Sequence, residues 1–363
     1  MKILILPDSF KGTLTAREAG EAMRRGAEAC GHSAQVIPLS DGGEGFCNCY
    51  AALCTCEKVE VQTLGTYLQP VNTYYCKNGD TAVIESAAAS GLCSRRDVLN
   101  ATSYGTGTLI AHAVKNGCQK IVLGLGGTGC SDGGIGALYA LGVRFFAEDM
   151  PYGIPKGCDM ELADSFCTDG VLPQLQSVQF LYATDVTAPY CGRLGAAYVF
   201  APQKGATHAQ AEKLDNGLFH LASLLKQQTG KDVKDLPGAG AAGGLCGGLW
   251  ALFGGEIQSG FDFLCRQADL PEKIRASDLV VTGEGKTDAQ TRMGKLPWRV
   301  WQLCQKAKTP CWLLSGQIEG EPFGDRAAAL CAPGGDSAYT TTHAAACLEN
   351  KMIKLLQSMP NLL

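Results

Sequence analysis

The sequence predicts an α/β protein of two domains, one of which is a parallel sheet assembled from both ends of the chain. Short apolar runs followed by polar turns and helices occur near the start, at residues 2–6 and 34–39, and recur near the end, at 278–282 and 310–315. The middle of the chain carries alternating hydrophobic segments that are typical of antiparallel strands. A length of 363 residues is also compatible with two domains of ordinary size.

The first fifty residues predict a strand, a helix, a strand and a helix, in that order. The apolar run 2–6 ends at a Pro-Asp turn, and TARE at 15–18 is a capping box that starts a helix running to residue 29. A second strand at 34–39 leads through DGGEG at 41–45 into a helix at 44–53. This alternation favours a parallel sheet that binds ligands at the carboxyl ends of its strands.

A different pattern follows. Segments 58–64, 71–76 and 81–86 alternate in polarity and are separated by turn residues, which predicts an antiparallel meander. The later predicted helices are 106–116, 132–141, 206–229, 239–253, 293–307 and 344–357, and the later predicted strands are 120–124, 179–185, 278–282 and 310–315. We therefore predict a discontinuous α/β domain at 1–56 and 277–363, with an inserted α/β domain at 57–276.

Composition excludes several classes of function. The formal net charge of −4 gives no strong electrostatic attraction to nucleic acid or to an anionic membrane. No apolar stretch reaches the ~18 residues of a membrane span, and the N-terminal apolar run is too short for a signal peptide, so we expect a cytoplasmic protein. Most of the 18 cysteines occur singly in core-like runs. Cys47, Cys49, Cys54 and Cys56 form two C-x-C pairs, but no C-x-x-C or histidine partner favours a zinc site.

Glycine is the outlier, with 46 residues, nearly twice the usual share of about 7%. The sequence GLGGTG at 124–129 fits G-x-G-x-x-G after a strand, and Glu148 lies about twenty residues further on, as in a dinucleotide site. The same pattern also suits a simple tight turn, or a loop whose amides hold a phosphate of ATP. GEGKT at 283–287 resembles the end of a P-loop, but Val280 stands where the first glycine is required.

Acidic residues follow the predicted strands in several separate loops. Each of them alone is typical of a turn or a helix cap, but together they suit a Mg²⁺–nucleotide site. These residues are Asp8, Asp41, Glu44, Asp132, Asp185, Glu284 and Asp288. The cations near the same loops are Lys11, Lys204, Lys286 and Lys295, which could neutralise a phosphate or a carboxylate.

Eight motifs together resemble those of the class I glycerate kinases, in the same order and over almost the whole chain. They are PDSFKGTLT at 7–15, PLSDGGEG at 38–45, IESAAASGL at 84–92, SYGTG at 103–107, GLGGTGCSDGG at 124–134, VFAPQKGA at 199–206, GAGAAGG at 238–244 and VTGEGKTDAQT at 281–291. The resemblance implies ATP-dependent phosphorylation of D-glycerate, with the 2-phosphate as the favoured product. It also implies that the discontinuous domain is flavodoxin-like.

Two positions depart from the family pattern. The family usually has Arg where this chain has Lys286, and lysine keeps the charge but loses the bidentate geometry. The segment ATDVTAP at 183–189 lacks an Asn that we expect before its proline.

On this basis we assign residues to roles, with ATP and Mg²⁺ as cofactors and a small-molecule substrate. Proton transfer and charge neutralisation fall to Asp185, Asp288, Lys11 and Lys286, and contact with substrate falls to Asp8, Ser9 and Lys11. Phosphates are expected at Ser103, Gly105, Thr106, Gly126, Gly127, Thr128 and Gly129, and Mg²⁺ is expected to draw on Asp41, Glu44, Asp132 and Glu284. A homo-oligomer is compatible with the sequence. Two alternatives stay open: an NAD(P)-dependent oxidoreductase that uses GLGGTG, and a non-catalytic sugar-acid binding protein.

Overall fold

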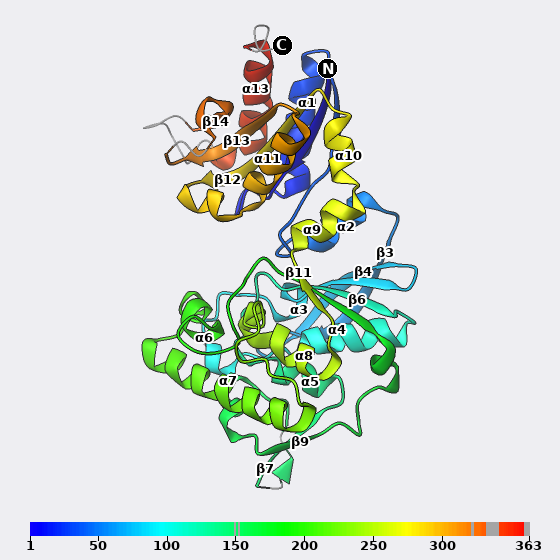
Figure 1. Ribbon diagram of the computed structural model, residues 1–363, viewed down its shortest axis with the longest axis vertical. Coiled ribbons are helices and arrows are strands. Elements are labelled where there is room, and N and C mark those ends of the chain that lie inside the picture. The colour runs from blue at the N-terminus through cyan, green and yellow to red at the C-terminus, as the bar shows by residue number, and fades with distance from the viewer. Residues whose placement is uncertain (149, 152, 321–322, 332–340, 359–363) are drawn as a thin grey trace. The chain divides into compact units, whose positions relative to one another are not determined.

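The computed structural model describes residues 1–148, 150–151, 153–320, 323–331 and 341–358 (Figure 1). The chain folds as two compact units. The first unit comprises residues 1–41, 48–53 and 261–363, and the second comprises 42–47 and 54–260. The predicted domain boundaries lie at 56/57 and 276/277 instead. Residues 261–276 fall in the first unit because Asp262 pairs with Arg299 and the Phe263 ring stacks on Tyr50.

The first unit is built on a five-stranded parallel sheet with the order β2-β1-β12-β13-β14. Counted along the chain, this is the order 2-1-3-4-5 of the flavodoxin-like doubly wound sheets. The strands are β1 (Lys2–Pro7), β2 (Ser33–Val36), β12 (Leu279–Thr287), β13 (Cys311–Ile318) and β14 (Ala327–Ala329). The α/β class and the parallel sheet predicted from the two ends of the chain are confirmed.

The helices of the first unit are α1 (Ala16–Ala29), α9 (Gly260–Gln267), α10 (Leu270–Arg275), α11 (Leu296–Ala307) and α13 (Ala344–Gln357), together with residues 48–53 of α2 (Phe46–Leu53). The predicted capping box of Thr15 and Glu18 starts α1. Helices α1 and α13 lie side by side (Figure 1). Gly26 makes this close approach possible, because the Cβ of any other residue there would clash with the Glu349 carbonyl oxygen at 2.6 Å. Their apolar faces cover Ile3, Ile5 and Val281 of the sheet.

The second unit has a six-stranded mixed sheet with the order β11-β10-β6-β5-β4-β3. Its strands are β3 (Glu57–Leu64), β4 (Pro70–Asn78), β5 (Thr81–Glu85), β6 (Lys120–Gly124), β10 (Gln179–Ala183) and β11 (Glu256–Gln258). The predicted antiparallel meander is confirmed in β3, β4 and β5, and β5 continues in parallel with β6. A small separate sheet contains β7 (Arg144–Ala147), β8 (Met150–Pro151) and β9 (Ser165–Cys167).

The helices of the second unit are α3 (Ala87–Ser90), α4 (Tyr104–Lys115), α5 (Ile135–Ala140), α6 (Ala196–Phe200), α7 (His208–Thr229) and α8 (Leu245–Phe253). The predicted helix 132–141 begins only at Ile135, so GLGGTG does not run directly into a helix. The predicted helix 239–253 is interrupted, because Ala242, Gly243 and Gly244 have left-handed backbone angles. Among the described residues, no helix has the length and apolar character needed to span a bilayer.

Candidate functional site

A cavity of about 480 Å³ lies within the first unit, where β1, β12 and β13 end. In sheets of this topology, ligands bind at the carboxyl ends of strands where the strand order reverses, and β1 and β12 form that point here. The charged residues that line the cavity are Asp8, Lys11, Asp41, Glu284, Lys286, Asp288 and Lys295. The cavity therefore brings together four of the seven predicted carboxylates.

Asp8 directly follows β1 and is partly buried. Its own amide donates to the Gly283 carbonyl oxygen at 2.9 Å, and its Oδ1 accepts the Ser9 amide at 2.6 Å. Burial raises the pKa of Asp8 to about 7, and the negative charge of Asp41 adds to this rise, while Lys11 opposes it. A carboxylate with such a pKa can accept a proton near neutral pH.

Glu284 is a strand residue, whereas the sequence predicted a loop from residue 283 onward. Strand β12 extends to Thr287 because its polar end pairs with β13, with Glu284 opposite Ser315. Oε1 of Glu284 accepts the hydroxyl groups of Thr287 and Thr291 at 2.8 and 2.9 Å, while Oε2 accepts no hydrogen bond from a described residue. Burial raises the pKa of Glu284, and the two hydroxyl groups oppose the rise.

The three cations of the cavity differ in their partners. Lys286 pairs with Glu319 at 2.7 Å, and Lys295 pairs with Asp288 at 3.1 Å. Lys11 is exposed and forms no ion pair with any residue in the described ranges. Lys11 is therefore the cation best able to take a new anionic partner. Lys295 was not among the assigned site residues, and Thr287 and Thr291 were missed, although TGEGKTDAQT places both hydroxyl groups within seven residues of Glu284.

The remaining predicted acidic residues belong to the second unit. Asp185 follows β10, Glu44 precedes α2, and both are exposed. The predicted helix 44–53 begins at Phe46, so Glu44 lies in the turn before it. That turn is held by Glu85, which accepts the amides of Gly45 and Cys47 at 3.3 and 2.7 Å. Glu85 lies in the IESAAASGL segment and was not predicted as a site residue.

Asp132 is fully buried, and its carboxylate is already occupied. Oδ2 accepts the amide and hydroxyl group of Ser103 at 2.7 and 2.8 Å and the amide of Gly136 at 3.3 Å, and Oδ1 accepts the amide of Gly134 at 3.2 Å. Ser103 in turn accepts the Ala137 amide at 2.9 Å. Burial raises the pKa of Asp132 while these hydrogen bonds oppose the rise. The arrangement favours a role in joining α4 to α5, and we leave Asp132 out of the metal set.

The SYGTG segment is likewise occupied by packing contacts. Both donors of Ser103 point to Asp132, and the Thr106 hydroxyl group contacts Ser90 at 2.8 Å and the Ser86 carbonyl oxygen at 3.1 Å. A Cβ at Gly105 would lie 1.9 Å from the Leu64 carbonyl oxygen, so this glycine allows α4 to approach β3. These contacts occupy the donors of Ser103 and the hydroxyl group of Thr106, and we do not carry the segment into the proposed nucleotide site.

The loop that follows β6, unlike the SYGTG segment, has several amides without an acceptor in the described part of the chain. Its backbone is held in place because the amides of Gly126 and Gly129 donate to the carbonyl oxygens of Gly42 and Ser90 at 3.1 and 2.8 Å. The amides of Gly127, Thr128, Ser131 and Asp132 donate to no acceptor within the described part of the chain, and Ser131 and Asp132 are fully buried. Buried backbone N–H groups are almost always paired in folded proteins. We define residues 126–131 as the anion loop, because free amides in a glycine-rich turn are complementary to phosphate.

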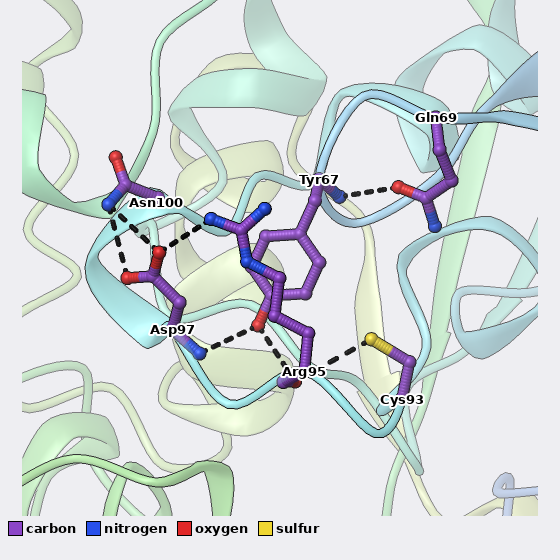
Figure 2. Close-up of polar contacts among 6 residues, drawn as sticks. All are labelled: Tyr67, Gln69, Cys93, Arg95, Asp97 and Asn100. Carbon is purple, nitrogen blue, oxygen red and sulfur yellow. Dashed lines mark hydrogen bonds and ion pairs between the residues drawn. The ribbon is translucent and has the colours of Figure 1, made fainter.

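A polar cluster fixes the segment beside the anion loop (Figure 2). Arg95 pairs with Asp97 at 2.7 Å and lies over the Tyr67 ring, and the Tyr67 hydroxyl group accepts the Asp97 amide and donates to the Arg95 carbonyl oxygen. The same segment joins the anion loop through the Leu92 amide, which donates to the Gly127 carbonyl oxygen at 3.0 Å. The segment that the cluster orders is therefore connected to the anion loop by the Leu92–Gly127 hydrogen bond.

The dinucleotide interpretation of GLGGTG finds no matching feature among the described residues. Since α5 begins only at Ile135, the GLGGTG loop does not open a helix as a dinucleotide fingerprint requires. Glu148 has a φ of 48° in a turn, where its amide donates to Asp164. All 18 cysteines are free, and no group of three or more His, Cys, Asp or Glu side chains that could hold a metal ion occurs among the described residues.

Several known proteins are similar to this chain in sequence or structure, and the three that follow are named as glycerate kinases. The chain is 37% identical to the glycerate 2-kinase of Escherichia coli (strain K12) over 88% of this chain and 86% of that protein. It is 38% identical to a glycerate kinase of Halalkalibacterium halodurans over 87% of this chain and 85% of that protein. A solved structure described as glycerate kinase 2 from Salmonella typhimurium LT2 matches with a TM-score of 0.81 and 32% identity, over 99% of both chains.

Phosphoryl transfer depends mainly on positioning and charge neutralisation, and an acidic cavity and a loop with open amides are suited to both tasks. The protein is a kinase, a phosphotransferase with an alcohol group as acceptor. The chain belongs to the glycerate kinase family, whose model matches residues 3–361.

Proposed function

We propose that this protein transfers the γ-phosphate of ATP to D-glycerate and that the product is 2-phosphoglycerate. The observation that carries the proposal is the cavity at the ends of β1 and β12, where an unpaired cation, Lys11, lies with a carboxyl group, Asp8, whose pKa is about 7. Glycerate offers a carboxylate that can pair with Lys11 and a hydroxyl proton that Asp8 can accept. The names of the similar proteins support the same substrate.

In this proposal the residues of the first unit bind and deprotonate glycerate. Lys11 pairs with the glycerate carboxylate, because Lys286 and Lys295 already have carboxylate partners. Asp8 accepts the proton of the hydroxyl group that attacks the phosphate. Asp288 orients Lys295 through their ion pair. Asp185, exposed after β10, is the second candidate for the proton acceptor.

The phosphates of ATP are assigned to the anion loop of the second unit. Its free amides can bind phosphate oxygens without any change in their own hydrogen bonding. Gly127, with a φ of 75°, adopts a backbone conformation that side-chain-bearing residues rarely accept. The product of the transfer and its position on glycerate are fixed by which hydroxyl group lies next to Asp8.

The residues of the cavity fit a Mg²⁺ ion. Oε2 of Glu284 accepts no hydrogen bond from a described residue, and Asp41 is exposed in the same cavity. Mg²⁺ in kinases usually takes one or two carboxylates and draws its other ligands from water and phosphate, so a set of two carboxylates suffices. When bound, the ion would neutralise charge on the transferring phosphate. We assign Asp41 and Glu284 to it.

The activity and the metal requirement are tested together. ADP release should depend on D-glycerate, and a ³¹P and ¹³C NMR spectrum of the product should show 2-phosphoglycerate. Thorough chelation of divalent cations should abolish turnover, and added Mg²⁺ should restore it. ADP release that is independent of glycerate would refute the substrate assignment, and turnover that survives chelation would refute the metal assignment.

Lys11→Ala should raise the KM for D-glycerate by about 10- to 100-fold with a smaller change in kcat, because it removes one charged hydrogen bond worth about 1.5–3 kcal/mol. Steady-state kinetics with glycerate as the varied substrate measure this. Lys286→Ala is the matched control in the same cavity, and its effect should be smaller because Lys286 is already paired with Glu319. Equal KM values for wild type and Lys11→Ala would remove Lys11 from the substrate site.

A further inference from the structure

Lys204 is a buried cation in the second unit for which the reaction outlined above has no use. It ends the short 3₁₀ turn Pro202–Lys204 and is 3% exposed. Its Nζ donates to the carbonyl oxygen of Cys130 and to Oγ of Ser131, the latter at 3.3 Å. Gly205, with a φ of 95°, then turns the chain sharply against Arg96.

The surroundings of this ammonium group are unusual for a buried charge. Lys204 forms no ion pair with a carboxylate in the part of the chain that the structure describes. Burial lowers its pKa, and the charges of Cys130 and Asp132 nearby oppose the fall. A buried charge costs several kcal/mol unless it is paired, and two neutral oxygens compensate only part of that cost. The described chain therefore gives the Lys204 amino group two neutral oxygen acceptors and, without an ion pair, the nearby charge of Asp132.

Both oxygens that Lys204 contacts belong to the end of the anion loop. Cys130 and Ser131 are fully buried, and the amides of Ser131 and Asp132, next along the chain, donate to no described acceptor. A cation on one side of a loop and open amides in the loop itself are together complementary to an anion. A bound phosphate would satisfy the amides and would interact favourably with the Lys204 charge.

We infer that Lys204 is a positioning residue for the nucleotide phosphates, which fixes the anion loop through Cys130 and Ser131 and balances the phosphate charge from within the second unit. This inference rests on the proposed function, because it takes the nucleotide as the ligand of the loop. It differs from that proposal in assigning part of the phosphate affinity to a side chain that is itself buried.

The test is the nucleotide affinity of the Lys204→Met variant of the full chain, since methionine fills a similar volume without charge. Isothermal titration calorimetry should show a Kd for ATP raised at least about tenfold, a smaller rise for ADP and AMP, and an unchanged Kd for adenosine. The KM for D-glycerate should not change. Lys213→Met, an exposed lysine on α7, is the matched control and should bind all four ligands as the wild type does.

Two outcomes would overturn the inference. The first is an unchanged ATP affinity in Lys204→Met, and the second is an equal loss for adenosine and ATP, which would indicate general damage to the second unit. If Lys204→Met does not fold, Ser131→Ala removes one of the two oxygens that Lys204 contacts and should weaken ATP binding a fewfold, while adenosine binding stays unchanged. Equal ATP affinity in Ser131→Ala and wild type would then count against it.

Failure of the proposed function would look different. If the wild type binds no ATP, inorganic tripolyphosphate is titrated into the wild type and into Lys204→Met. Tripolyphosphate binding by the wild type that is lost in Lys204→Met would support the role of Lys204 while rejecting ATP as the ligand. Equal tripolyphosphate affinity of the two proteins would overturn the inference about Lys204.

Discussion

Asp8→Asn should lower kcat by about 10²- to 10⁴-fold, the range that a positioned proton acceptor contributes. Asparagine has nearly the same shape and can still accept the Ser9 amide through its side-chain oxygen, so the backbone after β1 should keep its course. Only the ability to take a proton is removed. The measurement is kcat at saturating ATP and D-glycerate.

Asp185→Asn and Asp288→Asn are the matched variants for this experiment. If the proton acceptor is Asp185, the loss should appear in that variant, and Asp8→Asn should retain most of the activity. Asp288→Asn should have an intermediate effect, because it leaves Lys295 without its partner. A kcat of Asp8→Asn within a fewfold of wild type would exclude Asp8 as the proton acceptor.

Asp8→Asn should also stabilise the metal-free protein at high pH. The pKa of Asp8 is about 7 in the folded protein, against 3.8 for an unperturbed aspartate. Between these pH values the folded state holds a proton that the unfolded state has released, so folding stability falls as the pH rises from about 4 to about 7. Above pH 7 the penalty is complete and on the order of 4 kcal/mol. Asp8→Asn should therefore melt at a higher temperature than wild type at pH 8 and at nearly the same temperature at pH 4.

Local sequence signals were sufficient to predict most of the parallel sheet of the first unit. The apolar runs of β1 and β12 and the capping box of α1 are each contained in a few residues. Because parallel strands place their carboxyl ends at one edge, the chain order alone indicated that Asp8, Asp41 and Glu284 would meet. The polar end of β12 was missed, since GEGKT has the composition of a loop and becomes a strand only through its pairing with β13.

In the second unit such signals are ambiguous. Glycine, serine and threonine in SYGTG suit a phosphate loop and equally suit close helix packing, and the contacts of Gly105 and Thr106 favour packing. An acidic residue after a strand suits a metal site, but the donors that occupy Asp132 come partly from Ser103, 29 residues earlier. Neither the packing nor these long-range hydrogen bonds has a local sequence pattern. The role of Asp132 must therefore be tested through stability.

Asp132→Ala should destabilise the protein by about 3–5 kcal/mol, as expected when a buried ionic partner is removed and its donors are left unpaired. The donors are the amide and hydroxyl group of Ser103 and the amides of Gly134 and Gly136. For a domain of this size, that loss should lower the melting temperature by roughly 6–20 °C. Asp169→Ala, an exposed aspartate of the same unit, should melt as the wild type does.

The competing hypothesis, that Asp132 binds Mg²⁺, predicts a different result. Removal of a metal ligand would raise the Mg²⁺ concentration needed for half-maximal activity and would leave the melting temperature of the metal-free protein unchanged or higher, because a buried negative charge is lost. Thermal melts in excess chelator and Mg²⁺ titrations of activity therefore separate the two roles. Because all four hydrogen bonds to Asp132 come from the α4 and α5 termini, we expect the loss in the melts, with the Mg²⁺ requirement of the remaining folded protein unchanged.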